Sequence, residues 1–136
     1  MSSIIKLITF DLDDTLWDVR PALEAAEAAQ WTYLKARFPS LALAATPREQ
    51  IAGLRRSLLE ERPELMHHIS LFRQSFIERL LQHHDVPDGE AESAAREAFA
   101  AFLSQRHQVV VYANAQSVLN TLGRQFQLGA LTNGNA

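Results

Sequence analysis

Hydrophobic and polar positions change their spacing twice along the chain, and these changes divide it into three segments. A mostly apolar run from Ile4 to Phe10 comes first, and its side chains cannot all face one side, which is typical of a strand covered on both faces. Beyond Trp17 the spacing becomes helical and stays so to about residue 107. A β-favouring stretch, a short helix and a second apolar run over Phe126–Leu131 follow.

The middle segment predicts a small bundle of helices over residues 21–38, 46–61, 64–83 and 88–106. Each helix has apolar residues at steps of three or four, and prolines or capping residues mark the boundaries. The start of the second helix is the clearest. Thr46, Pro47 and Glu49 combine an N-cap, a proline at the first helical position and a capping-box acid.

The helical block separates two pieces of what we expect to be one α/β core. Residues 1–17 and 108–136 are assigned to this partial core, and residues 18–107 to an inserted helical lobe. In the second piece, Asn114 is expected to cap a short helix that ends at Gly123. No internal repeat or Gly/Ser-rich linker interrupts this plan.

Composition narrows the classes of function. The net charge of -3 gives no general attraction to nucleic acid or to an anionic membrane, so neither is expected as a partner. The sequence contains no cysteine, so its chemistry must come from oxygen and nitrogen groups. The apolar start is short and broken by Lys6, unlike a signal peptide or a membrane span, and a cytoplasmic location is expected.

Polar loops follow both predicted strands. The segment Thr9–Leu16 places three carboxylates and a hydroxyl directly after the first strand, with Asp11 at its carboxyl end. The second strand ends in Thr132-Asn133-Gly134-Asn135. Open α/β sheets bind ligands at this edge, so the two loops together predict a reaction centre, although either alone would be an ordinary turn.

These motifs carry a resemblance to a known family. Asp-x-Asp-x-Thr at a strand end, followed later by an apolar run and Thr-Asn-Gly, resembles the haloacid dehalogenase-like hydrolase superfamily, specifically its phosphatase branch. The resemblance covers the whole chain and implies a Rossmann-like core whose helical C1 cap closes over small soluble substrates. It implies that Asp11 is the nucleophile, Asp13 the general acid and base, and Thr132 a ligand of the phosphoryl group. It also implies Mg²⁺, bound by the Asp11 carboxylate and the Asp13 backbone carbonyl.

The residue types suit this chemistry independently. An ionised Asp11 can attack phosphorus and form an aspartyl-phosphate, while Asp13 protonates the departing alkoxide and later takes a proton from water. Acids beside a phosphate repel it, so a divalent cation is needed, and Mg²⁺ is the expected one. Thr132 and Asn133 can donate to phosphoryl oxygens, and Gly134 permits close backbone approach. We also count Thr15 among the phosphate-site residues, where its hydroxyl can brace the turn.

The acid at Asp13 favours phosphate ester hydrolysis over dehalogenation, because an oxygen leaving group must be protonated. Residues 9–16 with Asp18 and Arg20-Pro21, together with residues 132–136, look most like the bacterial pyrimidine phosphatases of riboflavin synthesis. We therefore expect a small phosphorylated metabolite as substrate. The sequence leaves the oligomeric state open.

Alternatives remain for the whole chain and for single residues. A phosphotransferase or mutase would share the aspartyl-phosphate step, and a noncatalytic helical module would bind a partner through apolar helix faces. Trp17 either stacks on a ring-bearing substrate or seals the junction between the lobes. Arg55, Arg56 and Arg62 are candidate phosphate contacts, although a solvated helix face is the better interpretation. The family's later lysine and metal-binding acids have no match here, so we expect a truncated or incompletely represented chain.

Overall fold

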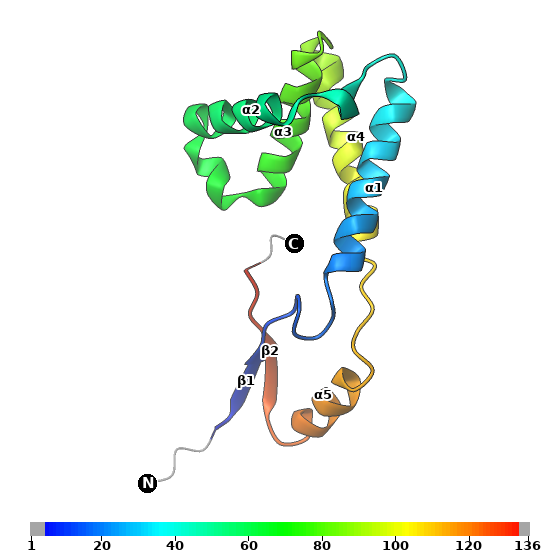
Figure 1. The fold of residues 1–136 in the computed structure, drawn as a ribbon. Coiled ribbons are helices and arrows are strands. Elements are labelled where there is room, and N and C mark those ends of the chain that lie inside the picture. Colours follow the sequence, from blue (N-terminus) through cyan, green and yellow to red (C-terminus); the bar gives the residue numbers. More distant parts are fainter. Residues whose placement is uncertain (1–4, 134–136) are drawn as a thin grey trace.

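Two parallel strands, β1 (Leu7–Phe10) and β2 (Gln127–Ala130), pair an early segment of the chain with a late one (Figure 1). The computed structural model describes residues 5–133. Leu7 pairs with Gln127 and Phe10 with Ala130, so the carboxyl ends of both strands meet at one edge of the sheet. Figure 1 shows the helical lobe beyond this edge. The parallel pairing therefore places the loop after β1, and Thr132 after β2, between the sheet and the lobe.

Four long helices build the lobe in the order that the sequence predicts: α1 (Arg20–Arg37), α2 (Arg48–Glu61), α3 (Ile69–His83) and α4 (Asp88–Arg106). Short 3-10 turns, η1 (Leu43–Ala45) and η2 (Pro63–His67), precede α2 and α3. The predicted helix over residues 64–83 is thus divided at His68. Within the described part of the chain, no helix is long and apolar enough to cross a membrane.

The capping prediction for α2 is wrong. Pro47 occupies the N-cap position, with no side-chain hydrogen bond to the helix start. The Thr46 hydroxyl instead donates to the Leu43 carbonyl at 2.8 Å, which leaves its oxygen to accept from Nε2 of His84 at 2.8 Å. Thr46 is buried, so its polar atom needs partners more than the exposed helix end does. It therefore ties η1 to the end of α3.

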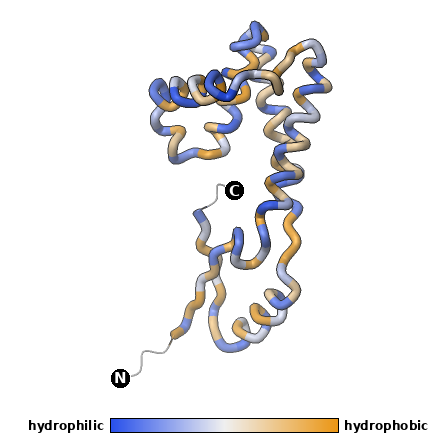
Figure 2. The backbone as a smooth tube through the Cα atoms, viewed as in Figure 1, coloured by the Kyte–Doolittle hydropathy of each residue, from blue (hydrophilic) through white to orange (hydrophobic). Residues whose placement is uncertain are grey.

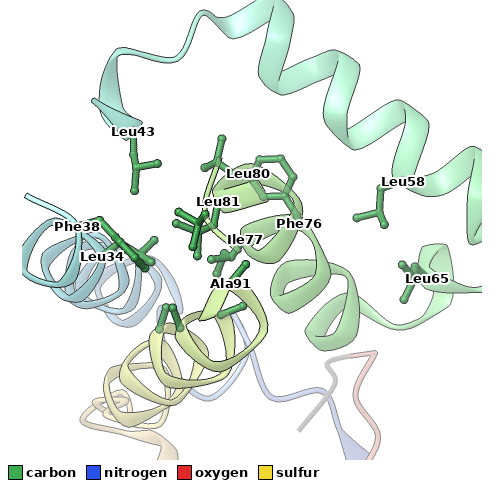
Figure 3. Packing of buried hydrophobic residues seen from close by; sticks show 14 residues of the cluster. Leu34, Phe38, Leu43, Leu58, Leu65, Phe76, Ile77, Leu80, Leu81 and Ala91 are labelled. Atoms are coloured by element: carbon green, nitrogen blue, oxygen red, sulfur yellow. The ribbon is translucent and has the colours of Figure 1, made fainter. Parts of the chain in front are cut away.

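The core of the lobe lies where α3 meets α1 and α4 (Figure 3). Alanines dominate the buried positions of α4. Their small side chains permit close approach, and α1 and α4 lie side by side (Figure 1). The largest fully buried side chains are Leu34, Leu43, Leu65, Ile77, Leu80 and Leu81. These contacts hold together α1 and α4, the two helices that connect the lobe to the sheet (Figure 1).

The sheet is less enclosed than the lobe. The helix α5 (Ala115–Gly123) packs near β2, where the Leu128 side chain approaches Gly123. In the described residues, however, Leu7 is 54% exposed and Leu131 71% exposed, and hydrophobic colour continues along the strands in Figure 2. The expectation that the first strand is covered on both faces is therefore not met within residues 5–133.

Candidate active site

The loop after β1 folds back on itself before α1 begins. The N–H groups of Thr15 and Leu16 donate to the Leu12 carbonyl at 3.1 and 2.9 Å, and the Asp14 N–H donates to the Trp17 carbonyl at 2.7 Å. Backbone groups thus make the bracing bonds that the sequence interpretation assigned to the Thr15 hydroxyl. Asp14 has a φ of 60°, a left-handed conformation that Asp tolerates better than most residues.

Two acids connect this loop to the start of α1. Oδ1 of Asp14 accepts the Val19 N–H at 3.2 Å, and Oδ1 of Asp18 accepts the Arg20 N–H at 3.0 Å. Arg20 also pairs with the Asp18 carboxylate at 2.8 Å, and its side-chain hydrogen bond is the main reason that the pKa of Asp18 is lowered. These bonds satisfy N–H groups at the helix start that have no partner inside the helix.

Asp13 lies at the centre of the junction between loop and lobe. Its Oδ1 accepts the Trp17 Nε1–H at 2.8 Å, and its Oδ2 lies 2.5 Å from a guanidinium nitrogen of Arg106. Trp17 belongs to the same loop, whereas Arg106 ends α4. Both carboxylate oxygens are therefore held by nitrogen donors, and the pair connects the lobe directly to the loop.

A cavity of about 450 Å³ opens beside Asp13, between the sheet edge and the lobe. The loops contribute Leu12, Asp13, Trp17 and Thr132 to it, while α3 and α4 contribute most of the opposite wall. That wall combines apolar side chains with a few polar groups: Ile69, Ser70, Arg73, Phe99, Phe102, Leu103 and Arg106. Such a mixture is typical of sites for small ligands.

Arg73 is the second cation in this cavity. Its guanidinium lies 4.0 Å from the centre of the Phe102 ring and 3.7 Å from the Glu27 carboxylate. Burial is the main reason that the pKa of Arg73 is lowered, although the group remains a cation at neutral pH. Stacking on an aromatic ring holds the planar guanidinium in one orientation at the cavity wall.

The structure brings some of the predicted site residues together and separates others. Asp13 and Thr132 line the same cavity, and Asp11 is exposed at the end of β1, next to the cavity residue Leu12. Asn133 is exposed directly after Thr132. Thr15 lines a different hollow of about 170 Å³, beside α5. Gly134 lies outside the described residues.

The sequence interpretation missed both cavity arginines. Its candidates lie elsewhere: Arg55 stacks over Phe76 at 4.8 Å, and Arg62 pairs with Glu64 at 3.0 Å. A signal for Arg106 did exist, because a cation in the last turn of the helix that returns to the core must lie near the sheet edge. Arg73 has no comparable signal, since the approach of α3 to the cavity depends on tertiary packing.

The donors at the loop fit part of a magnesium site. Asp11 offers an exposed carboxylate and Asp13 a backbone carbonyl, and both are the hard oxygen donors that Mg²⁺ prefers. Among residues 5–133, no group of three or more His, Asp or Glu side chains converges to hold a metal ion. A cation here would therefore depend on water, substrate oxygens or further protein ligands.

Known proteins resemble this chain over nearly its whole length. The family model for haloacid dehalogenase-like hydrolase matches residues 5–136. The Escherichia coli (strain K12) protein named 5-amino-6-(5-phospho-D-ribitylamino)uracil phosphatase YigB is 33% identical over 132 residues, which are 97% of this chain and 55% of that protein. The chain thus spans about half the length of this relative.

Two solved structures are similar as well. A protein named 2-haloacid dehalogenase, from Pseudomonas syringae pv. Tomato DC3000, matches with a TM-score of 0.86 and 42% identity, over 98% of this chain and 57% of that one. A haloacid dehalogenase-like family hydrolase from Xanthomonas campestris matches with a TM-score of 0.52 and 20% identity, over 96% of this chain and 52% of that one. The second likeness bears on the fold alone.

Proposed function

The chain belongs to the haloacid dehalogenase-like hydrolase family, and on that basis we propose that it carries the nucleophile, the general acid and base, and a phosphate ligand of a Mg²⁺-dependent phosphatase. Family and fold agree with the sequence prediction of a partial α/β core carrying a helical cap. The substrate class in this proposal is a small phosphorylated metabolite.

One observation carries the proposal: Asp11 and Thr132 follow two adjacent parallel strands at the same sheet edge. The Leu131 N–H donates to the Phe10 carbonyl at 2.8 Å, which keeps the strands in register to the point where both loops begin. This arrangement supports the proposal that a carboxylate nucleophile and a hydroxyl donor approach one ligand from neighbouring positions. Asp13 shares its cavity with Thr132, which supports placing the reacting ester there.

The proposed reaction has two steps. An Asp11 oxygen attacks phosphorus, the ester P–O bond breaks, and the leaving oxygen keeps the electron pair and takes a proton from Asp13. Water then attacks the aspartyl-phosphate and passes a proton to Asp13, while the bond between phosphorus and the Asp11 oxygen breaks and its electron pair returns to Asp11. Thr132 and the Asn133 N–H donate to phosphoryl oxygens as charge develops there.

Mg²⁺ is part of this proposal through the donors on the β1 loop. The Asp11 carboxylate and the Asp13 backbone carbonyl would hold it, and when bound it would offset repulsion between carboxylate and phosphate. The chain's own contribution is a loop that begins at Asp11 and is held in a turn by backbone bonds to the carbonyls of Leu12 and Trp17.

The cavity suits a metabolite that carries an apolar or ring-bearing part beside its phosphate. Aromatic and aliphatic side chains make most of its wall, and Arg73 adds a stacked cation. A phosphorylated pyrimidine of the riboflavin pathway has these features, and the name of the Escherichia coli relative supports including it among the substrates to be tested. A cytoplasmic location accompanies this proposal as a prediction.

Dehalogenation is the second candidate, because one of the similar solved structures is that of a protein named 2-haloacid dehalogenase. Both reactions can begin with attack by Asp11. They differ at the leaving group, since halide leaves without a proton and an alkoxide does not. The placement of Asp13 in the cavity therefore favours the ester.

The test uses the full-length protein with Mg²⁺ and p-nitrophenyl phosphate, and in parallel with 2-chloropropionate. We expect release of p-nitrophenol, no release of chloride, and loss of activity in Asp11→Asn with an unchanged melting temperature. Retained activity in Asp11→Asn would refute the nucleophile assignment. Product analysis with an added alcohol distinguishes hydrolysis from phosphoryl transfer, and absence of any turnover would favour a noncatalytic module.

A further inference from the structure

The ion pair between Asp13 and Arg106 differs from the other ion pairs of residues 5–133. Its side chains are 31% and 23% exposed, whereas those of Glu92 and Arg96, elsewhere on α4, are 57% and 58% exposed. Asp13 and Arg106 are 93 residues apart in sequence. A partly desolvated contact between a loop and a distant helix end fixes side-chain positions better than an exposed pair does.

We infer that Arg106, together with Trp17, is a positioning residue that holds Asp13 ready to accept a proton in the second step of the reaction. This inference rests on the proposed phosphatase function. Both oxygens of Asp13 accept from nitrogen donors that come from two different parts of the chain, so the carboxyl group is held in one orientation beside the cavity.

The second step requires a base in this place. Water attacks phosphorus, the bond to the Asp11 oxygen breaks with its electron pair returning to Asp11, and the proton of water passes to Asp13. The bonds from Arg106 and Trp17 keep the Asp13 carboxyl group in place until the proton arrives. Without Arg106, Asp13 keeps the bond from Trp17 alone and is free to rotate out of line.

The first step with p-nitrophenyl phosphate depends little on Asp13, because p-nitrophenolate leaves without being protonated. Loss of Arg106 is therefore expected to slow hydrolysis of the aspartyl-phosphate and to spare its formation. Slowing only the second step lowers kcat and KM together and leaves kcat/KM nearly unchanged. A variant that is merely less folded loses kcat and kcat/KM equally and keeps its KM.

The experiment measures steady-state and rapid-mixing kinetics of full-length Arg106→Met and Arg106→Lys on p-nitrophenyl phosphate. In Arg106→Met we expect kcat to fall about tenfold to a hundredfold, a mispositioned base losing much of its contribution. A burst of p-nitrophenol approaching one equivalent per enzyme should precede the slow phase. Arg106→Lys should recover part of kcat. Trp17→Phe should show the changes expected for Arg106→Met, with a smaller fall in kcat.

Arg96→Met is the matched control, because Arg96 lies on the same helix and pairs with Glu92 in solvent. It should leave kcat, KM and the burst unchanged. If Arg106→Met lowers kcat and kcat/KM equally without a burst, or behaves like Arg96→Met, the inference is wrong while the phosphatase proposal stands. If Asp11→Asn retains activity, the phosphatase proposal itself fails.

Discussion

The phenol of Tyr33 on α1 donates a 2.5 Å hydrogen bond to the Glu97 carboxylate on α4, which joins the two helices that connect lobe and sheet. Burial first, and then this bond, raises the pKa of Tyr33 to about 12. The same bond is the main reason that the pKa of Glu97 is lowered. The contribution of this contact to stability is therefore expected to change at alkaline pH, where Tyr33 ionises.

We predict that stability falls between pH 10 and about pH 12 through ionisation of Tyr33 in the unfolded chain. Below pH 10 both states keep the phenolic proton, and above that pH the unfolded state loses it first, so unfolding becomes more favourable until the folded pKa is passed. Melting temperatures of the wild type and Tyr33→Phe should converge or cross over this interval. A constant difference between them would contradict the raised pKa.

Leu81 and Leu71 both lie on α3, but Leu81 is buried in the core and Leu71 is exposed at the surface. Leu81 is 0% exposed and belongs to the central cluster in Figure 3, whereas Leu71 is 52% exposed. Leu81→Ala should lower the free energy of unfolding by about 2–5 kcal/mol, because it removes buried methyl groups and leaves a cavity. Leu71→Ala should change it by about 0.5 kcal/mol or less. Denaturant unfolding of both variants measures the contrast.

The order of helices and strands was predictable because each follows from local spacing. The four helices begin and end near the residues where apolar periodicity, prolines and capping residues mark them. Thr46 shows where local signals fail, since its hydroxyl is buried by tertiary packing and bonds to Leu43 and His84 instead of a helix start. A capping motif in sequence does not record which side chains become buried.

The candidate site was predictable in part for the same reason. Two polar loops after two strands meet because the strands pair in parallel, and this placed Asp13 near Thr132. The sequence did not show that Thr15 lies apart from Asp13 and Thr132. The fold of the β1 loop places Thr15 in another hollow. Nor could it find Arg73, whose partners Phe102 and Glu27 come from two other helices.

Asp14 and Asp85 both have left-handed backbone conformations, with φ angles of 60° and 62°. Alanine at either site should cost about 1 kcal/mol or more in strain. Only Asp14 adds a side-chain bond, to the Val19 N–H, while within the described residues the Asp85 carboxylate has no such partner. Glycine relieves the strain at both sites, so Asp85→Gly should be close to neutral.

Asp14→Gly should nevertheless remain destabilising by about 0.5–1.5 kcal/mol, the usual worth of one hydrogen bond. Asp14→Asn keeps both the tolerance for this conformation and the acceptor, and should match the wild type. Urea unfolding of the glycine and asparagine variants tests this. Equal stability of Asp14→Gly and Asp85→Gly would show that the bond to Val19 contributes nothing.

Arg73 and Arg79 form a matched pair for testing the cavity wall. Both lie on α3 and both side chains are 26% exposed, but Arg73 lines the cavity, whereas Arg79 makes two hydrogen bonds to Glu61 away from it. Arg73→Leu removes the stacked cation from the substrate's path. In the full-length protein it should raise KM for p-nitrophenyl phosphate about tenfold, the loss of one contact of about 1.4 kcal/mol, with little change in kcat.

Arg79→Leu should leave both kinetic constants unchanged, because its guanidinium holds α2 to α3 and does not reach the cavity. In the proposed function the phosphate reacts at the sheet edge and the ring part of the substrate stays against the lobe, so we expect binding by Arg73 to be uniform along the reaction. A fall in kcat without a change in KM would instead assign Arg73 to the transition state. Equal kinetics for Arg73→Leu and Arg79→Leu would remove Arg73 from the substrate site.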